Sequence, residues 1–184
     1  MIYLIEGARN SGKTFITSFF RESKDYKFPF TQWFGDLGYD DEKKETHDFA
    51  LGKEIMLMDL NKKGFIENMI CDRGIITVFV WAVLSGRITE QRAIDELNLV
   101  IKDGLFDNVK ILWVKGKNPN QSPRNKDFWD RREQEKEKEH LLFNSFLGKL
   151  KMGSSNIDIK EVENTFDDKV KVKLEEIKNV WNIN

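Results

Sequence analysis

Eight residues near the start of the chain, Gly7-Ala8-Arg9-Asn10-Ser11-Gly12-Lys13-Thr14, have the types and the spacing of a phosphate-binding loop. They fit the pattern G-x-x-x-x-G-K-[ST] without a mismatch. The glycines let the backbone curl so that successive N–H groups point at a phosphate, and a helix that begins at Gly12 adds the positive end of its dipole. The sequence therefore predicts a nucleotide-binding site, and we call residues 7–14 the phosphate-binding loop.

The side chains of this loop predict how ATP and Mg²⁺ are held. Lys13 is expected to reach the β- and γ-phosphates, and the Thr14 hydroxyl is expected to bind the metal. The other predicted nucleotide contacts in the loop are Gly7, Asn10, Ser11 and Gly12. The alternative is a turn that only connects a strand to a helix. The apolar run before the loop and the helical pattern after it favour the nucleotide site.

A second acidic ligand for the metal is expected at the end of another strand. The apolar run 69–71 ends at Asp72 and is stopped by Gly74, as a central strand would be. The competing residue, Asp59, lies in a segment of good helix formers over 46–62, where it would be solvated or capping. We therefore predict Asp72 as the catalytic and metal-binding carboxylate, with Asp72–Arg73 as a purely structural ion pair as the alternative.

Basic residues gather later in the chain. Arg124 and Arg131 are seven residues apart, so they share a face if one helix carries both. Planar guanidinium groups suit the charge that spreads over a phosphoryl group during transfer. The alternative is an exposed helix, because residues 131–139 read RREQEKEKE and alternate in charge.

The pattern of apolar runs predicts the elements that position these residues. Strands are expected at 2–5, 26–33, 69–71, 109–114 and 157–162. Helices are expected at 12–22, 46–62, 75–85, 89–102, 127–150 and 166–181. Alternating strands and helices indicate an α/β fold with a parallel sheet covered on both faces. At 184 residues, the sequence predicts a single domain over 1–184.

Composition excludes several classes of protein. The net charge of −1 gives no global attraction for nucleic acid, and no apolar run reaches the roughly 18 residues that cross a bilayer. The one cysteine, Cys71, excludes an intrachain disulfide and fits a cytoplasmic location. His47 and His140 are expected at the surface or as caps, without the spacing of a zinc site. Four residues are expected in the core: Leu141, Leu142, Phe146 and Leu150.

The assembled motifs resemble the thymidylate kinase and deoxynucleoside kinase branch of the P-loop kinases. The resemblance rests on the phosphate-binding loop, on Asp72-Arg73-Gly74 after a strand, and on Asp130-Arg131-Arg132-Glu133 at a helix start. It implies a three-layer fold whose five-stranded parallel sheet has the order 2-3-1-4-5. It also implies that Arg73 holds the acceptor, and that an arginine-bearing lid over about 116–130 brings Arg124 and Arg131 to the transferred group.

One departure from this family leaves the acceptor open. The family usually carries a glutamate after the second strand, whereas residues 30–36 read FTQWFGD. Trp33 or Phe34 could stack on a base that Gln32 reads, and Asp36 could replace the carboxylate. Equally, the aromatic residues could belong to the core.

The main prediction is therefore an ATP- and Mg²⁺-dependent kinase for a nucleotide or nucleoside. A polynucleotide 5′-end kinase is the second reading, although nucleic acid is not favoured as a partner. A nucleotide-binding switch or assembly ATPase without a small-molecule acceptor is the third. The pattern leaves both a monomer and a homodimer open.

Overall fold

The computed structural model describes residues 1–8, 11–21, 44–116, 133–164 and 168–183. The predicted strand at 26–33 and the predicted helix start at 127–132 lie outside these residues, as does most of the predicted lid. The described part is an α/β fold, as the alternating apolar runs predict.

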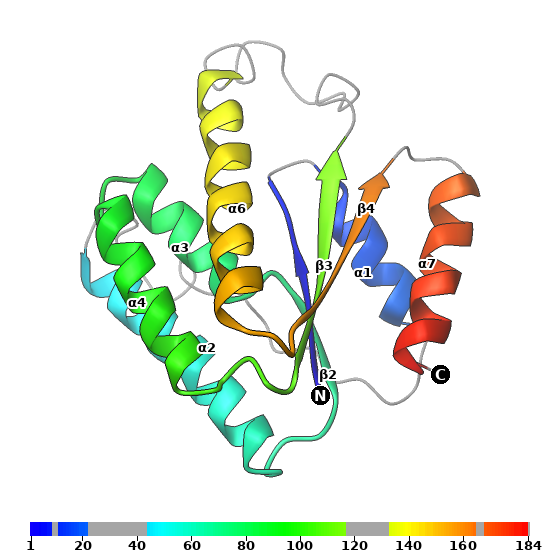
Figure 1. Ribbon diagram of the computed structural model, residues 1–184. Helices are drawn as coiled ribbons and strands as arrows, with labels where there is room; N and C mark the ends of the chain where they lie inside the picture. Colours follow the sequence, from blue (N-terminus) through cyan, green and yellow to red (C-terminus); the bar gives the residue numbers. More distant parts are fainter. Residues whose placement is uncertain (9–10, 22–43, 117–132, 165–167, 184) are drawn as a thin grey trace.

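The described strands form one parallel sheet in the order β2-β1-β3-β4. These strands are β1 (Ile2–Glu6), β2 (Met69–Asp72), β3 (Val109–Gly116) and β4 (Asp158–Asn164). Their order agrees with the predicted five-stranded order once the strand at 26–33 is left out. Because all four strands run the same way, their carboxyl ends meet at one edge of the sheet, at the top of Figure 1.

Helices cover both faces of the sheet (Figure 1). One face carries α2 (Lys44–Lys62), α3 (Ile75–Leu84), α4 (Glu90–Lys102) and α6 (Glu133–Gly153). The other face carries α1 (Lys13–Arg21) and α7 (Asp168–Trp181). No helix in the described ranges is long and apolar enough to cross a membrane.

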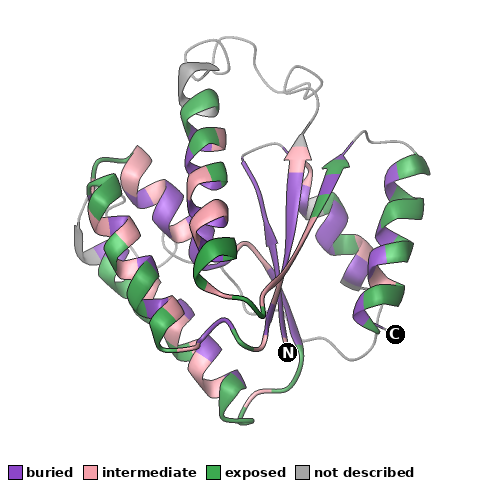
Figure 2. Cartoon of the chain, viewed as in Figure 1, coloured by how far each residue is buried: buried purple, intermediate pink, exposed green. Residues whose placement is uncertain are grey.

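The alternation of side chains along β1 divides the core in two. Ile2 and Leu4 pack with the large helical layer, whereas Tyr3 and Ile5 pack with α1 and α7. All five residues of β1 are buried, as a central parallel strand should be (Figure 2). The next residue on the first of these faces is the carboxyl-bearing Glu6, at the carboxyl edge.

The boundaries of α4 follow from its sequence. The Thr89 side chain accepts a hydrogen bond from the Arg92 backbone N–H at 3.2 Å, as an N-cap does. Beyond the helix, Gly104 has a φ of +64°, which glycine adopts with little strain. Both signals were readable from the sequence.

Two burial predictions are wrong. Leu141 is 61 % exposed, although Leu142, Phe146 and Leu150 are buried as predicted. The i, i+1 pair Leu141–Leu142 cannot turn both side chains to one face of a helix. His47 is fully buried rather than at the surface, because it packs beside Phe79.

Phe79 tests the packing of the larger core. Its fully buried ring lies 6.1 Å from the His47 ring and 6.0 Å from the Phe146 ring. We expect Phe79→Ala to lower the free energy of unfolding by about 3–5 kcal/mol, because it leaves a cavity. The control is Phe65→Ala, at a ring that is 77 % exposed, which should change it by less than about 0.5 kcal/mol. Denaturant unfolding measures both; equal losses would contradict the packing.

Candidate functional site

The phosphate-binding loop starts where β1 ends, at the carboxyl edge of the sheet. Gly7 has a φ of +152°, and a Cβ on it would lie 2.3 Å from the Val114 carbonyl oxygen of β3. Gly12 has a φ of +85° and precedes the first residue of α1. Both glycines are therefore required by the backbone, and the loop delivers the N-terminus of α1 to the sheet edge.

The Lys13 ammonium is buried within this loop. Its Nζ donates hydrogen bonds to the carbonyl oxygens of Gly7 and Ala8, both at 2.6 Å. Burial, and after it the nearby Arg73 guanidinium, lowers the pKa of Lys13 from its ordinary 10.5 to about 8. Three carboxyl groups oppose this shift: Glu139, Asp72 and Glu6. The described part of the site is thus a mixed cluster of charges around one ammonium.

Asp72 lies at the carboxyl end of β2, as predicted, and pairs in register with Ile5 of β1. By alternation it belongs to the same face as Ile70, which packs in the core beneath α1. Asp59, the competing candidate, lies in α2 and forms an exposed ion pair with Lys63 at 2.7 Å. The strand and helix assignments behind the choice of Asp72 are therefore confirmed.

Arg73 follows Asp72 in a strained turn. Its φ is +78°, and its backbone N–H donates to the Ile5 carbonyl oxygen at 2.9 Å. Its guanidinium lies 4.4 Å from the centre of the Trp81 ring, two turns into α3. The stacking and the backbone bond together hold Arg73 beside the phosphate-binding loop.

Three buried polar residues of the site were missed in the sequence: Glu6, Glu139 and Asn164. The Asn164 side-chain amide donates to the Ser11 carbonyl oxygen at 3.0 Å, so the end of β4 fastens the phosphate-binding loop. Glu139, on α6, is hidden in the sequence by the charge run that contains it. The position of Glu6 between an apolar strand and the first loop glycine is a signal that could have identified it.

Glu6 is fully buried and bonded to the start of α3. Its carboxylate accepts hydrogen bonds from the backbone N–H groups of Ile76 at 3.1 Å and Thr77 at 3.4 Å, and from the Thr77 hydroxyl. Burial raises the pKa of Glu6 to about 7; the hydrogen bonds from Thr77 oppose the shift, and the nearby Glu54 adds to it. Desolvation therefore outweighs the hydrogen bonds.

Several predicted site residues lie outside the described residues: Asn10, Arg124, Arg131 and the acceptor candidates Gln32 and Asp36. For Thr14, only its backbone position in α1 is described. His140, predicted at the surface or as a cap, is half-buried on α6, and burial lowers its pKa.

His47 has neighbours of the metal-binding type. One ring nitrogen of His47 and one carboxylate oxygen each of Asp48 and Glu96 lie within 4.8 Å of one another. The Arg92 guanidinium, however, already contacts Glu96 at 2.6 Å and Asp48 at 3.0 Å. This arginine supplies the positive charge that the carboxylates require, so the group is a charge network at the α2–α4 contact.

No protein-family model and no curated protein matches the chain. Solved structures do share its fold. Deoxyadenosine kinase from M. mycoides, with the products dCMP and a flexible dCDP bound, is 16 % identical with a TM-score of 0.59, over 99 % of this chain and 98 % of that one. YorR from Bacillus subtilis, in complex with phosphorylated GDP, is 13 % identical with a TM-score of 0.59, over 99 % and 98 %. NadR in complex with NR is 14 % identical with a TM-score of 0.59, over 97 % of this chain and 50 % of that one. The fold is thus P-loop kinase-like.

The raised pKa of Glu6 predicts how stability depends on pH. The native carboxyl group holds its proton up to about pH 7, whereas its ordinary value is 4.5. Between these values the native state binds more protons, so this contribution to stability is complete below pH 4.5 and is lost as pH rises through 7. Relative to Glu6→Gln, wild type should lose about 3 kcal/mol of unfolding free energy across that window. Denaturant unfolding at several pH values measures the difference; parallel curves would contradict the shift.

Proposed function

We propose that the chain is an ATP-dependent phosphotransferase that moves the γ-phosphoryl group to a nucleoside or nucleotide, with residues 1–184 acting as one kinase domain. The observation that carries the proposal is the buried Lys13 ammonium, bonded to two carbonyl oxygens of the phosphate-binding loop. Arg73 and Asp72, from the adjacent strand end, lie close enough to shift its pKa. A cation that the loop already holds in place can bind the phosphates of a nucleotide without first being reoriented.

The residues present fit ATP and Mg²⁺. Backbone N–H groups at the start of α1 and the Lys13 ammonium would hold the phosphates, with Gly7, Asn10, Ser11 and Gly12 completing the loop. Thr14 and Asp72 supply the oxygen ligands that Mg²⁺ prefers. When bound, Mg²⁺ neutralises charge on the phosphates.

The acceptor would lie on the Arg73 side of the loop. Arg73 is fixed over Trp81, so its guanidinium is positioned before any ligand arrives. Arg124 and Arg131 are proposed, from the family resemblance, to close over the transferred group as a lid. The lid would keep water from taking the phosphoryl group.

The fold likeness supports a small acceptor. The matching structures include a deoxyadenosine kinase with dCMP bound and NadR with NR bound. A screen with radiolabelled ATP would test nucleosides, nucleoside monophosphates and 5′-hydroxyl oligonucleotides. Transfer to a nucleoside or monophosphate supports the proposal. Labelling of oligonucleotides alone would indicate an end kinase, and phosphate release without any labelled acceptor would indicate a switch or assembly ATPase.

Lys13→Ala should abolish phosphoryl transfer and preserve the fold. The ammonium serves the ligand and lies outside the hydrophobic core, and the substitution removes only its hydrogen bonds to the Gly7 and Ala8 carbonyl oxygens. Initial rates at saturating ATP and thermal unfolding measure the two effects. Lys171→Ala, at an exposed lysine of α7, is the matched control and should leave the rate unchanged. Near wild-type turnover by Lys13→Ala would refute the proposed role of the loop.

Asp72→Asn should reduce kcat at least about 100-fold, because a metal ligand at the sheet edge would be lost. Asp59→Asn removes only an exposed ion pair with Lys63 and should keep kcat within about twofold. Steady-state kinetics at several Mg²⁺ concentrations compare these isosteric variants. Similar losses from both, with unchanged unfolding midpoints, would show that the wrong carboxylate has been chosen.

A further inference from the structure

We propose that Glu6 is a positioning residue: it caps α3 from the neighbouring strand and thereby sets the place of Arg73 beside the phosphate-binding loop. The proposal rests on the proposed function for its consequence at the acceptor. The cap itself is a matter of packing and hydrogen bonding, which can be tested without any reaction.

The start of α3 has no cap of its own. Its N-cap residue is Gly74, which carries no side chain to accept from the free backbone N–H groups of the first turn. A larger residue there would push against two buried side chains. A Cβ on Gly74 would lie 2.8 Å from Leu4 Cδ2 and 3.1 Å from Glu6 Oε1. The packing of α3 against β1 therefore disfavours the usual capping residues.

Glu6 supplies what Gly74 cannot. Its Oε1 accepts from the N–H groups of Ile76 and Thr77, and its Oε2 accepts from the Thr77 hydroxyl. These donors belong to the first turn of α3, whose backbone N–H groups have no partner within the helix. Since Glu6 is fully buried, no water replaces these bonds when they are lost.

This cap bears on Arg73 because Arg73 is held from both ends. Its backbone N–H is bonded to Ile5, the residue before Glu6, and its guanidinium stacks on Trp81 of α3. A shift of the first turn of α3 would move Trp81 relative to β1 and disturb both contacts. Glu6 also directly precedes Gly7, the first residue of the phosphate-binding loop. It therefore connects that loop to the α3 turn that positions Arg73.

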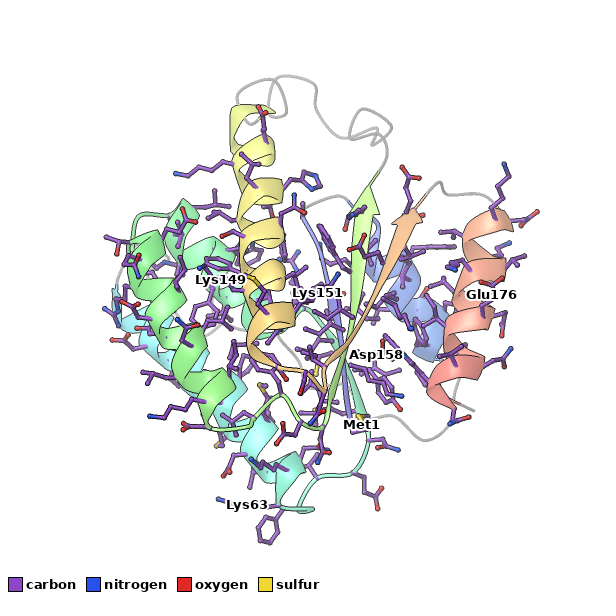
Figure 3. The ribbon with its side chains drawn as sticks, viewed as in Figure 1. Met1, Lys63, Lys149, Lys151, Asp158 and Glu176 are labelled. Atoms are coloured by element: carbon purple, nitrogen blue, oxygen red, sulfur yellow. The ribbon has the colours of Figure 1, made fainter. Side chains whose placement is uncertain are left out.

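The test compares four variants. Glu6→Leu removes all acceptors, and Glu6→Gln keeps an oxygen for the backbone N–H groups. Thr77→Val removes the α3 hydroxyl that donates to Glu6 and leaves the residues of the phosphate-binding loop unchanged. The matched control is Asn61→Leu, which also replaces a buried polar side chain but lies near the end of α2, the region that Lys63 marks in Figure 3. Asn61 donates to the carbonyl oxygens of Ile66 and Glu67, before β2 begins.

Hydrogen exchange reads the cap directly. In Glu6→Leu the amides of Ile76 and Thr77 should exchange at least about tenfold faster, as expected when a helix cap is lost, and Glu6→Gln should restore most of the protection. Asn61→Leu should leave these two amides unchanged even though it destabilises the fold. Unchanged exchange in Glu6→Leu, or equal acceleration in Asn61→Leu, would overturn the proposal.

Steady-state kinetics measure how loss of the cap affects use of the acceptor. Glu6→Leu and Thr77→Val should raise KM for the acceptor or lower kcat by about tenfold, and Thr77→Val should keep the affinity for a nonhydrolysable ATP analogue within about twofold. Asn61→Leu should change neither. An equal loss of ATP-analogue affinity in Thr77→Val would overturn the positioning of Arg73. If wild type labels no acceptor, the proposed function fails, and hydrogen exchange alone decides whether Glu6 is the cap.

Discussion

The Lys13 ammonium lies buried, 2.6 Å from each of two backbone carbonyl oxygens. A buried cation is costly unless polar atoms surround it, and here the loop that holds it provides them. Carboxyl groups lie near this cation for the same reason. Asp72 ends the adjacent strand β2, and Glu6 ends β1, the strand that leads into the loop. Arg73 adds a second positive charge, which repels the Lys13 ammonium. An anion that binds between the two would relieve this repulsion.

The parallel sheet brings these charged residues together because the carboxyl ends of its strands lie at one edge. Alternation along β1 sends Leu4 and then Glu6 to the same face, so an apolar core changes to a charged site within two residues. On the opposite face, Asp72 continues the row of Ile70. The hydrophobic packing that stabilises the sheet thereby determines which carboxylate faces α3 and which shares the face of α1.

Local signals made much of this architecture predictable. The phosphate-binding loop, the strand that ends at Asp72 and the Thr89 cap of α4 each depend on residues a few positions apart. The misses at His47 and Glu6 have long-range causes. His47 is buried by Phe79, which lies 32 residues later on another helix. Glu6 acts on backbone groups 70 and 71 residues away, and no periodicity in the sequence marks such a pair.

The bond from Asn164 to the Ser11 carbonyl oxygen joins residues 153 positions apart. A ribosome releases the phosphate-binding loop long before β4, the last strand in the described ranges. Until β4 takes its place beside β3, the loop lacks one of the donors that hold its backbone. A growing polypeptide therefore carries the whole sequence motif early, but the motif gains the support of Asn164 only when β4 joins the sheet.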